Sequence, residues 1–177
     1  MVKKEQETFL KDMFFGSSWR AAATRHVVWG GAYQDNYAKR VAFRVQIQRK
    51  AESFLADYKN KTPPEELHLK NIESLKALSK ELGNELTLGT VQKLFNLLCK
   101  YYWCAGFIQE PPHLPVDRII LQSIKSKQTW TQLDSMEEYK EIIAAFRKKI
   151  AEEGFDSLAE WELTVWNAAE KKEEDIE

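Results

Sequence analysis

The sequence is poor in residues that interrupt helices and in residues that build metal or disulfide sites. It has seven Gly and five Pro in 177 residues, and no segment alternates apolar and polar residues long enough to predict a half-buried strand. Its two cysteines, Cys99 and Cys104, are too few for a four-thiolate zinc or iron–sulfur site, and their spacing of five matches no common metal motif. We therefore expect an all-α protein with reduced, largely buried thiols and without metal or cofactor.

Long apolar runs are missing as well. No run approaches the roughly 18 to 20 residues that span a bilayer, and the opening residues 1–4 lead into an acidic amphipathic stretch, which is not typical of a signal peptide. We expect a cytoplasmic protein with no membrane association. The length, 44% hydrophobic residues and 30% charged residues are those of one globular domain.

Charge is unevenly distributed, although the net charge is only -1. Residues 39–100 carry 12 Lys and Arg against 7 Asp and Glu, whereas residues 101–177 carry 9 against 16. Five of the late acids fall in residues 170–177, which have almost no apolar content. The expected organisation is a single helical domain over 1–169 and an acidic, disordered tail over 170–177. The nearly neutral body neither requires nor excludes a nucleic-acid partner.

Apolar residues recur at helical spacing along the chain and predict a compact array of about seven helices. The longest is expected over 35–58 and ends before Pro63 and Pro64. Two further helices are predicted over 67–82 and 90–103, and another begins near residue 116. The last two predicted helices begin at capping boxes, Ser135 with Glu138 and Ser157 with Glu160, and a stop at Gly154 separates them.

Two segments carry the groups best suited to chemistry. In residues 86–96, Gly89 opens a helix that holds Lys93 near its start, and in residues 114–120, Pro115 leads into a helix that holds Asp117 at its start. A helix amino terminus and a dry environment both lower the pKa of a lysine, which makes the amine a nucleophile near neutral pH. Lys93 and Asp117 are therefore candidate catalytic residues. A solvated lysine and a simple helix cap remain the ordinary alternatives.

The glycine turn, Lys93 in the following helix and the later Pro115-Val116-Asp117 resemble the helix-hairpin-helix DNA glycosylases. Residues 155–166 are in addition similar to the closing helix of the archaeal 8-oxoguanine glycosylases. The resemblance implies a helix-hairpin-helix-like element and a DNA-lesion glycosylase for an oxidised base. It also implies that Lys93 attacks C1′ of an extruded nucleotide, with AP-lyase activity through the resulting imine, and that Asp117 stabilises the oxocarbenium charge.

A DNA substrate implies phosphate contacts and an aromatic base pocket. Aromatic residues at helical spacing are also typical of a hydrophobic core, and basic residues at helical spacing are also typical of a solvated helix face. The phosphate-contact candidates are Gly89, Arg40, Arg44, Lys100, Arg118 and Lys125, and the base-pocket candidates are Tyr101, Trp103, Phe107 and Trp166.

Two other functions stay open at this point. Arg20 followed six residues later by His26 fits the loose motif of HEPN ribonucleases, and six Trp with a long basic helix fit a non-catalytic helical adaptor of a phage or mobile element. Geometry separates these alternatives from the glycosylase. If Lys93 and Asp117 form one site, their side chains converge within about 8 Å at a shared cleft.

Overall fold

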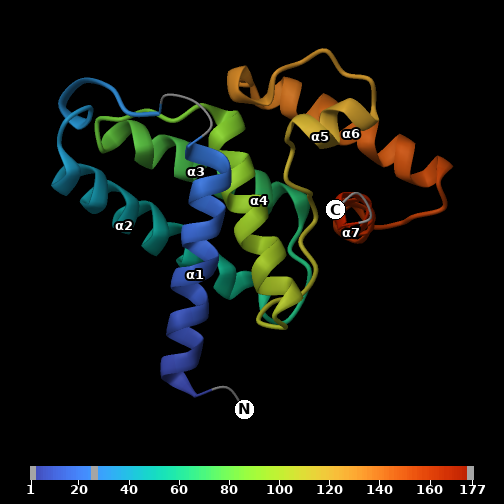
Figure 1. Cartoon of the computed structure of the whole chain (residues 1–177), viewed down its shortest axis with the longest axis horizontal. Coiled ribbons are helices and arrows are strands. Elements are labelled where there is room, and N and C mark those ends of the chain that lie inside the picture. The colour runs from blue at the N-terminus through green and yellow to red at the C-terminus, as the bar shows by residue number, and fades with distance from the viewer. Residues whose placement is uncertain (1–2, 25–27, 175–177) are drawn as a thin grey trace.

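The computed structural model describes residues 3–24 and 28–174, and within them every regular element is a helix (Figure 1). This confirms the expected all-α fold. The seven α-helices are α1 (Lys4–Ala23), α2 (Tyr37–Phe54), α3 (Glu65–Glu81), α4 (Leu88–Cys104), α5 (Arg118–Ser123), α6 (Met136–Glu152) and α7 (Leu158–Glu174), and short 3-10 turns lie at Gly31–Tyr33, Leu55–Tyr58 and Trp130–Gln132.

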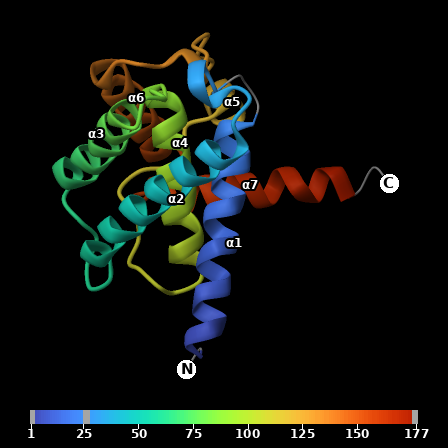
Figure 2. The same ribbon diagram turned by 90° about the vertical axis from the view of Figure 1, so that its left-hand side faces the viewer.

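Helix α4 forms the centre of the molecule. Every residue from Leu88 to Lys100 except Leu97 is buried, so this helix is enclosed around almost its whole circumference. Its main helical neighbour is α1. Figures 1 and 2 show α2 on one side of the α1–α4 pair and α7 on the other. Side chains of α4 can therefore reach both halves of the fold.

The helix ends agree with the predicted signals in several places. The Ser135 hydroxyl accepts from the Glu138 amide at 3.3 Å, and the Ser157 hydroxyl accepts from the Glu160 amide at 3.0 Å. Gly154 follows α6 with a φ of 80°, in the left-handed region that favours glycine. Both predicted capping serines are confirmed.

One predicted boundary is wrong. The longest helix of the described residues is α1, with 20 residues, because the segment predicted over 35–58 leaves the α-helix at Phe54 and tightens into the 3-10 turn Leu55–Tyr58. Helix α7 continues to Glu174, and the division into a domain over 1–169 and a tail over 170–177 stays a prediction. A helix that has already started adds one backbone hydrogen bond for each further residue, which supports even a polar extension. Residues 175–177 lie outside the described residues.

Gly89 has a packing role at the start of α4. Its amide donates to the Leu133 carbonyl at 2.7 Å, and a Cβ at this position would overlap the backbone carbonyl of Trp130. The buried amide of Gly89 is directed at a protein carbonyl in this structure, and its phosphate contact stays a prediction. The helix start is capped instead by Thr87, whose hydroxyl accepts from the Thr90 amide at 3.2 Å. The helix-hairpin-helix-like element stays a prediction.

We expect Gly89→Ala to lower the free energy of unfolding by about 3 kcal/mol, because the Trp130 backbone has to move away from the added methyl group. Urea unfolding followed by circular dichroism measures the change. Gly16→Ala is the matched control: Gly16 lies inside α1 with nothing near its Cβ direction, so we expect a gain of about 0.5 to 1 kcal/mol. Equal effects of the two substitutions would contradict the close approach at Gly89.

Candidate functional site

Lys93 and Asp117 meet across two helices. The Lys93 Nζ lies 3.3 Å from the Asp117 Oδ2, and the two side chains are 3% and 15% exposed. Lys93 lies in the second turn of α4, whereas Asp117 is the residue before α5. The convergence expected from the sequence is confirmed as a geometric fact, and the chemical roles of the two residues stay a prediction.

The two carboxylate oxygens of Asp117 have different partners. Oδ1 accepts from the Ile120 amide at 3.1 Å and caps α5, which leaves Oδ2 for the Lys93 ammonium. The cap fixes the carboxylate plane, since the side chain cannot rotate without losing the bond to the helix. Capping and ion pairing therefore coexist in one residue, and the two interpretations of Asp117 are compatible.

Trp130 completes the surroundings of the Lys93 amine. The Lys93 Nζ lies 4.4 Å from the centroid of the Trp130 ring, in the range of a cation–π contact. Trp130 belongs to the 3-10 turn that packs against Gly89, so the same close approach that requires glycine also brings the ring to the amine. Trp130 is not among the site residues predicted from the sequence. The one feature that could have indicated it is a large aromatic residue in an otherwise polar loop.

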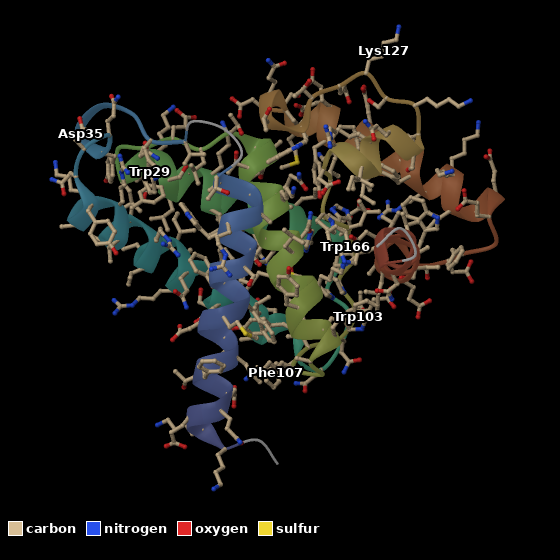
Figure 3. All side chains as sticks on the ribbon, viewed as in Figure 1. Trp29, Asp35, Trp103, Phe107, Lys127 and Trp166 are labelled. Carbon is tan, nitrogen blue, oxygen red and sulfur yellow. The ribbon has the colours of Figure 1, made fainter. Side chains whose placement is uncertain are left out.

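Lys93 and Asp117 line a cavity of about 450 Å³, a volume typical of small-ligand sites. Its walls come from α1, α4, the start of α5 and α7. Figure 3 shows Trp166 projecting from α7 on the side of α4 that faces away from Trp29. The other polar and aromatic residues of the lining are Lys100, Tyr101, Cys104, Trp166 and Asn167.

Lys100, which also lines this cavity, belongs to a second ion pair. The Lys100 Nζ lies 2.7 Å from one Glu162 oxygen and 3.0 Å from the other, and both residues are buried. Lys100 follows Lys93 by seven residues, about two helical turns, so the two lysines share a face of α4. Burial raises the pKa of Glu162, while the Lys100 ammonium acts in the opposite direction.

Lys100 is therefore buried and paired, and its role as a phosphate contact stays a prediction. Its Nζ also lies 5.1 Å from the centroid of the Trp166 ring. Glu162 is not among the site residues predicted from the sequence. Its position could have indicated it, because Glu162 shares the core-facing side of α7 with Leu158 and Trp161, where a carboxylate is unusual.

The predicted base-pocket residues divide into two groups. Tyr101 and Trp166 line the cavity, where Tyr101 stacks on Phe14 at 5.7 Å and Trp166 is 41% exposed. Trp103 packs against the core, and Phe107 lines a different groove. Neither residue lines the cavity, because α4 rotates about 100° per residue and ends at Cys104, and their role in a base pocket stays a prediction.

The predicted phosphate contacts do not share one face. On α2, Arg40 donates from Nε to the Tyr33 carbonyl at 2.6 Å, and the Arg44 guanidinium lies 5.4 Å from the centroid of the Trp19 ring. Burial lowers the pKa of Arg44. Figures 1 and 2 place α2 on the opposite side of the molecule from α7, and neither arginine lines the cavity, so their role as phosphate contacts stays a prediction.

Two of the predicted phosphate-contact residues follow Asp117 closely in the sequence. Arg118 is the first residue of α5, directly after Asp117, and its side chain is exposed. Lys125 is exposed just after α5 and has a φ of 54°. Both positively charged side chains are therefore exposed to solvent at or next to α5.

The thiols differ from each other. Cys99 is buried, as expected, whereas Cys104 is exposed and lines the cavity, so the prediction that both are buried is wrong for Cys104. Burial raises the pKa of both thiols, which lowers their reactivity. The Arg20 and His26 motif cannot be assembled as a site, since His26 lies outside the described residues.

Comparison with known proteins adds no relative: no family model, curated protein or solved structure matches this chain. Among residues 3–24 and 28–174, no helix has the length and apolar character needed to cross a membrane. Over the same ranges, no group of three or more His, Cys, Asp or Glu side chains is arranged to hold a metal ion.

Proposed function

We propose that the protein is a DNA-lesion glycosylase that uses Lys93 as its nucleophile and acts on an oxidised base of cytoplasmic DNA. The observation that carries the proposal is the Lys93–Asp117 pair, 3.3 Å apart on the wall of a cavity of about 450 Å³. A buried amine beside a carboxylate is the arrangement that a lysine nucleophile needs, because the carboxylate can hold the proton that the amine must lose.

The reaction can be written with this chain's residues. Asp117 takes a proton from the Lys93 ammonium, and the free amine forms a bond to C1′ as the glycosidic bond breaks. The bonding electrons leave with the base, which receives the proton that Asp117 holds. As this proton passes to the departing base, Asp117 regains its charge, and the carboxylate stabilises the positive charge that develops on the sugar.

The resulting aminal opens to an imine between Lys93 and C1′, as the sugar ring oxygen takes a proton from the nitrogen. The imine acidifies the C2′ proton. The Asp117 carboxylate, ionised again, takes this proton, and the C2′–C3′ double bond forms as the bond from C3′ to the 3′ phosphate breaks. Water then hydrolyses the imine and returns the Lys93 amine. This sequence supplies both base release and AP-lyase activity from one lysine.

The other cavity residues fit an extruded base. Trp166 offers a partly exposed ring and Tyr101 a second one, and a planar base gains by stacking on either. Lys100 also lines the cavity and holds its ammonium over the Trp166 ring, while the buried Glu162 neutralises its charge. Arg118 and Lys125 are the phosphate contacts that we retain in the proposal, because both are exposed near α5.

Borohydride trapping tests the proposal. Hydride reduces the imine to a stable secondary amine, so we expect a covalent protein–DNA adduct when the full chain is incubated with borohydride and duplexes that carry single oxidised bases or an abasic site. Peptide mapping is expected to place the adduct on Lys93, and Lys93→Gln is expected to abolish it. No adduct with any of these duplexes, or an adduct that persists in Lys93→Gln, would overturn the proposal.

A further inference from the structure

Gln92 links the two halves of the candidate site. Its side-chain amide makes a two-way bridge to the backbone of Val116: Nε2 donates to the Val116 carbonyl at 2.7 Å, and Oε1 accepts from the Val116 amide at 3.1 Å. Gln92 is the residue before Lys93, and Val116 is the residue before Asp117. The bridge therefore connects the two chain segments one residue away from the pair that meets at 3.3 Å.

The Gln92 amide has no hydrogen-bonding capacity left over. Besides the two bonds to Val116, Nε2 donates to the Gly89 carbonyl at 3.0 Å, and Oε1 accepts from the Asn96 Nδ2 at 3.2 Å. Both donors and both acceptor positions are thus used. Since Gln92 is fully buried, any rotation of the amide would leave polar groups unpaired away from water, which holds it in one orientation.

A buried network orients the Asn96 amide in turn. Asn96 Nδ2 also donates to the Tyr139 hydroxyl at 3.0 Å, Tyr139 contacts His113 Nδ1 at 2.9 Å, and His113 Nε2 lies 2.9 Å from Glu65 Oε1. A carboxylate only accepts, so His113 Nε2 donates to Glu65, and the neutral ring accepts the Tyr139 proton at Nδ1. Burial lowers the pKa of His113 to about 4, which keeps this donor order at neutral pH.

We propose that Gln92 is a positioning residue that sets the Asp117 carboxylate against the Lys93 amine. The segment 114–117 comes from a loop, and the Gln92 bridge to Val116 ties it to the rigid central helix. Without the bridge, Asp117 keeps its cap on α5, but α5 and its aspartate are free to shift relative to α4. The catalytic meaning of this role rests on the proposed function, whereas the geometric role does not.

Gln92→Met tests the geometric role, because methionine has a similar length and shape but cannot form the bridge. The first readout is the rate at which acetic anhydride acylates Lys93 at fixed pH, measured by mass spectrometry of the folded full chain. Asp117→Asn sets the value for an amine without its carboxylate, and we expect a several-fold faster acylation there, since an ammonium that loses its counter-charge releases its proton more readily. We expect Gln92→Met to approach that value.

Ser79→Ala is the matched control. Ser79 is also buried, and its hydroxyl accepts from the Leu86 amide at 2.9 Å, so the substitution removes a buried polar contact that does not touch Val116. We expect its Lys93 acylation rate to stay at the wild-type value. If Gln92→Met does not fold, Gln92→Leu replaces it in the comparison, because leucine also cannot form the bridge and adds no charge near Lys93.

The second readout is the borohydride-trapping rate, which we expect Gln92→Met to reduce at least tenfold while Ser79→Ala leaves it unchanged. A folded Gln92 variant that keeps the wild-type acylation rate would overturn the positioning role. If the wild-type protein forms no adduct but the acylation rates change as expected, the positioning role stands and the proposed function fails. The two proposals are thus decided by separate measurements.

Discussion

Asp117→Asn is expected to lower the single-turnover rate of base release by about 10²- to 10⁴-fold, the range that a positioned acid–base group contributes. Asparagine has an oxygen in the place of Oδ1, so the bond to the Ile120 amide and the α5 cap are retained. What is lost is the charge 3.3 Å from the Lys93 Nζ, and with it the proton acceptor and the stabilisation of the oxocarbenium ion. Release of the lesion base under single-turnover conditions measures the effect, at a temperature where circular dichroism shows the variant folded.

Asp134→Asn is the control for this substitution. The Asp134 carboxylate also accepts from a backbone amide at a helix start, that of Leu88 at 2.9 Å, and also pairs with a lysine, Lys76 at 3.1 Å. It does not line the cavity. We expect Asp134→Asn to change the rate less than twofold. A similar loss in both variants would assign the effect to general disturbance of helix caps, and an unaltered rate in Asp117→Asn would remove the aspartate from the mechanism.

Lys100→Met is expected to lower the free energy of unfolding by about 3 to 5 kcal/mol at pH 8, the cost of leaving one partner of a buried ion pair alone. The Glu162 carboxylate is buried and has its Lys100 partner at 2.7 Å. Burial already raises its pKa, and loss of the ammonium raises that pKa further. The penalty is therefore largest where Glu162 is forced to ionise, and it shrinks as the pH falls and the carboxyl group becomes protonated.

Urea unfolding at several pH values measures this dependence. The double variant Lys100→Met/Glu162→Leu removes both charges, so we expect it to regain most of the lost stability and to lose the extra pH dependence. Lys149→Met serves as the exposed control, because Lys149 pairs with Glu153 only four residues away on the surface and contributes less than about 1 kcal/mol. A Lys100→Met penalty that is small, or that grows on acidification, would contradict the buried pair.

Much of the fold could be predicted from local sequence. Ser135, Ser157 and Gly154 mark helix ends by side-chain and backbone rules that act within a few residues, and the structure follows them. Prediction was less accurate where contacts with residues distant in the sequence determine the local structure. The end of α2 is an example, because Leu55 and Tyr58 are buried in a 3-10 turn that the apolar spacing alone does not distinguish from further α-helix.

The candidate site shows the same division. Lys93 and Asp117 were identified because each lies near a helix start next to a turn residue, a pattern visible in the sequence. Trp130 and Glu162 were not identified, since their relevance depends on contacts across 37 and 62 residues, respectively. Lys100 was placed on the surface because a lysine is usually solvated, yet its neighbours on α7 enclose it.

The sequence by itself determined the helical class, most helix starts and the two polar groups at the beginnings of α4 and α5, because these follow from spacing, caps and breakers within a turn or two. Only the tertiary structure decided which charges face one another. It paired Lys93 with Asp117 and Lys100 with Glu162, brought both lysines and Asp117 to the wall of one cavity, and placed Arg40 and Arg44 on aromatic rings outside its lining. The physical reason is that ion pairs and cavities form between segments distant in the chain, and the packing of α4 against its neighbours determines how those segments meet.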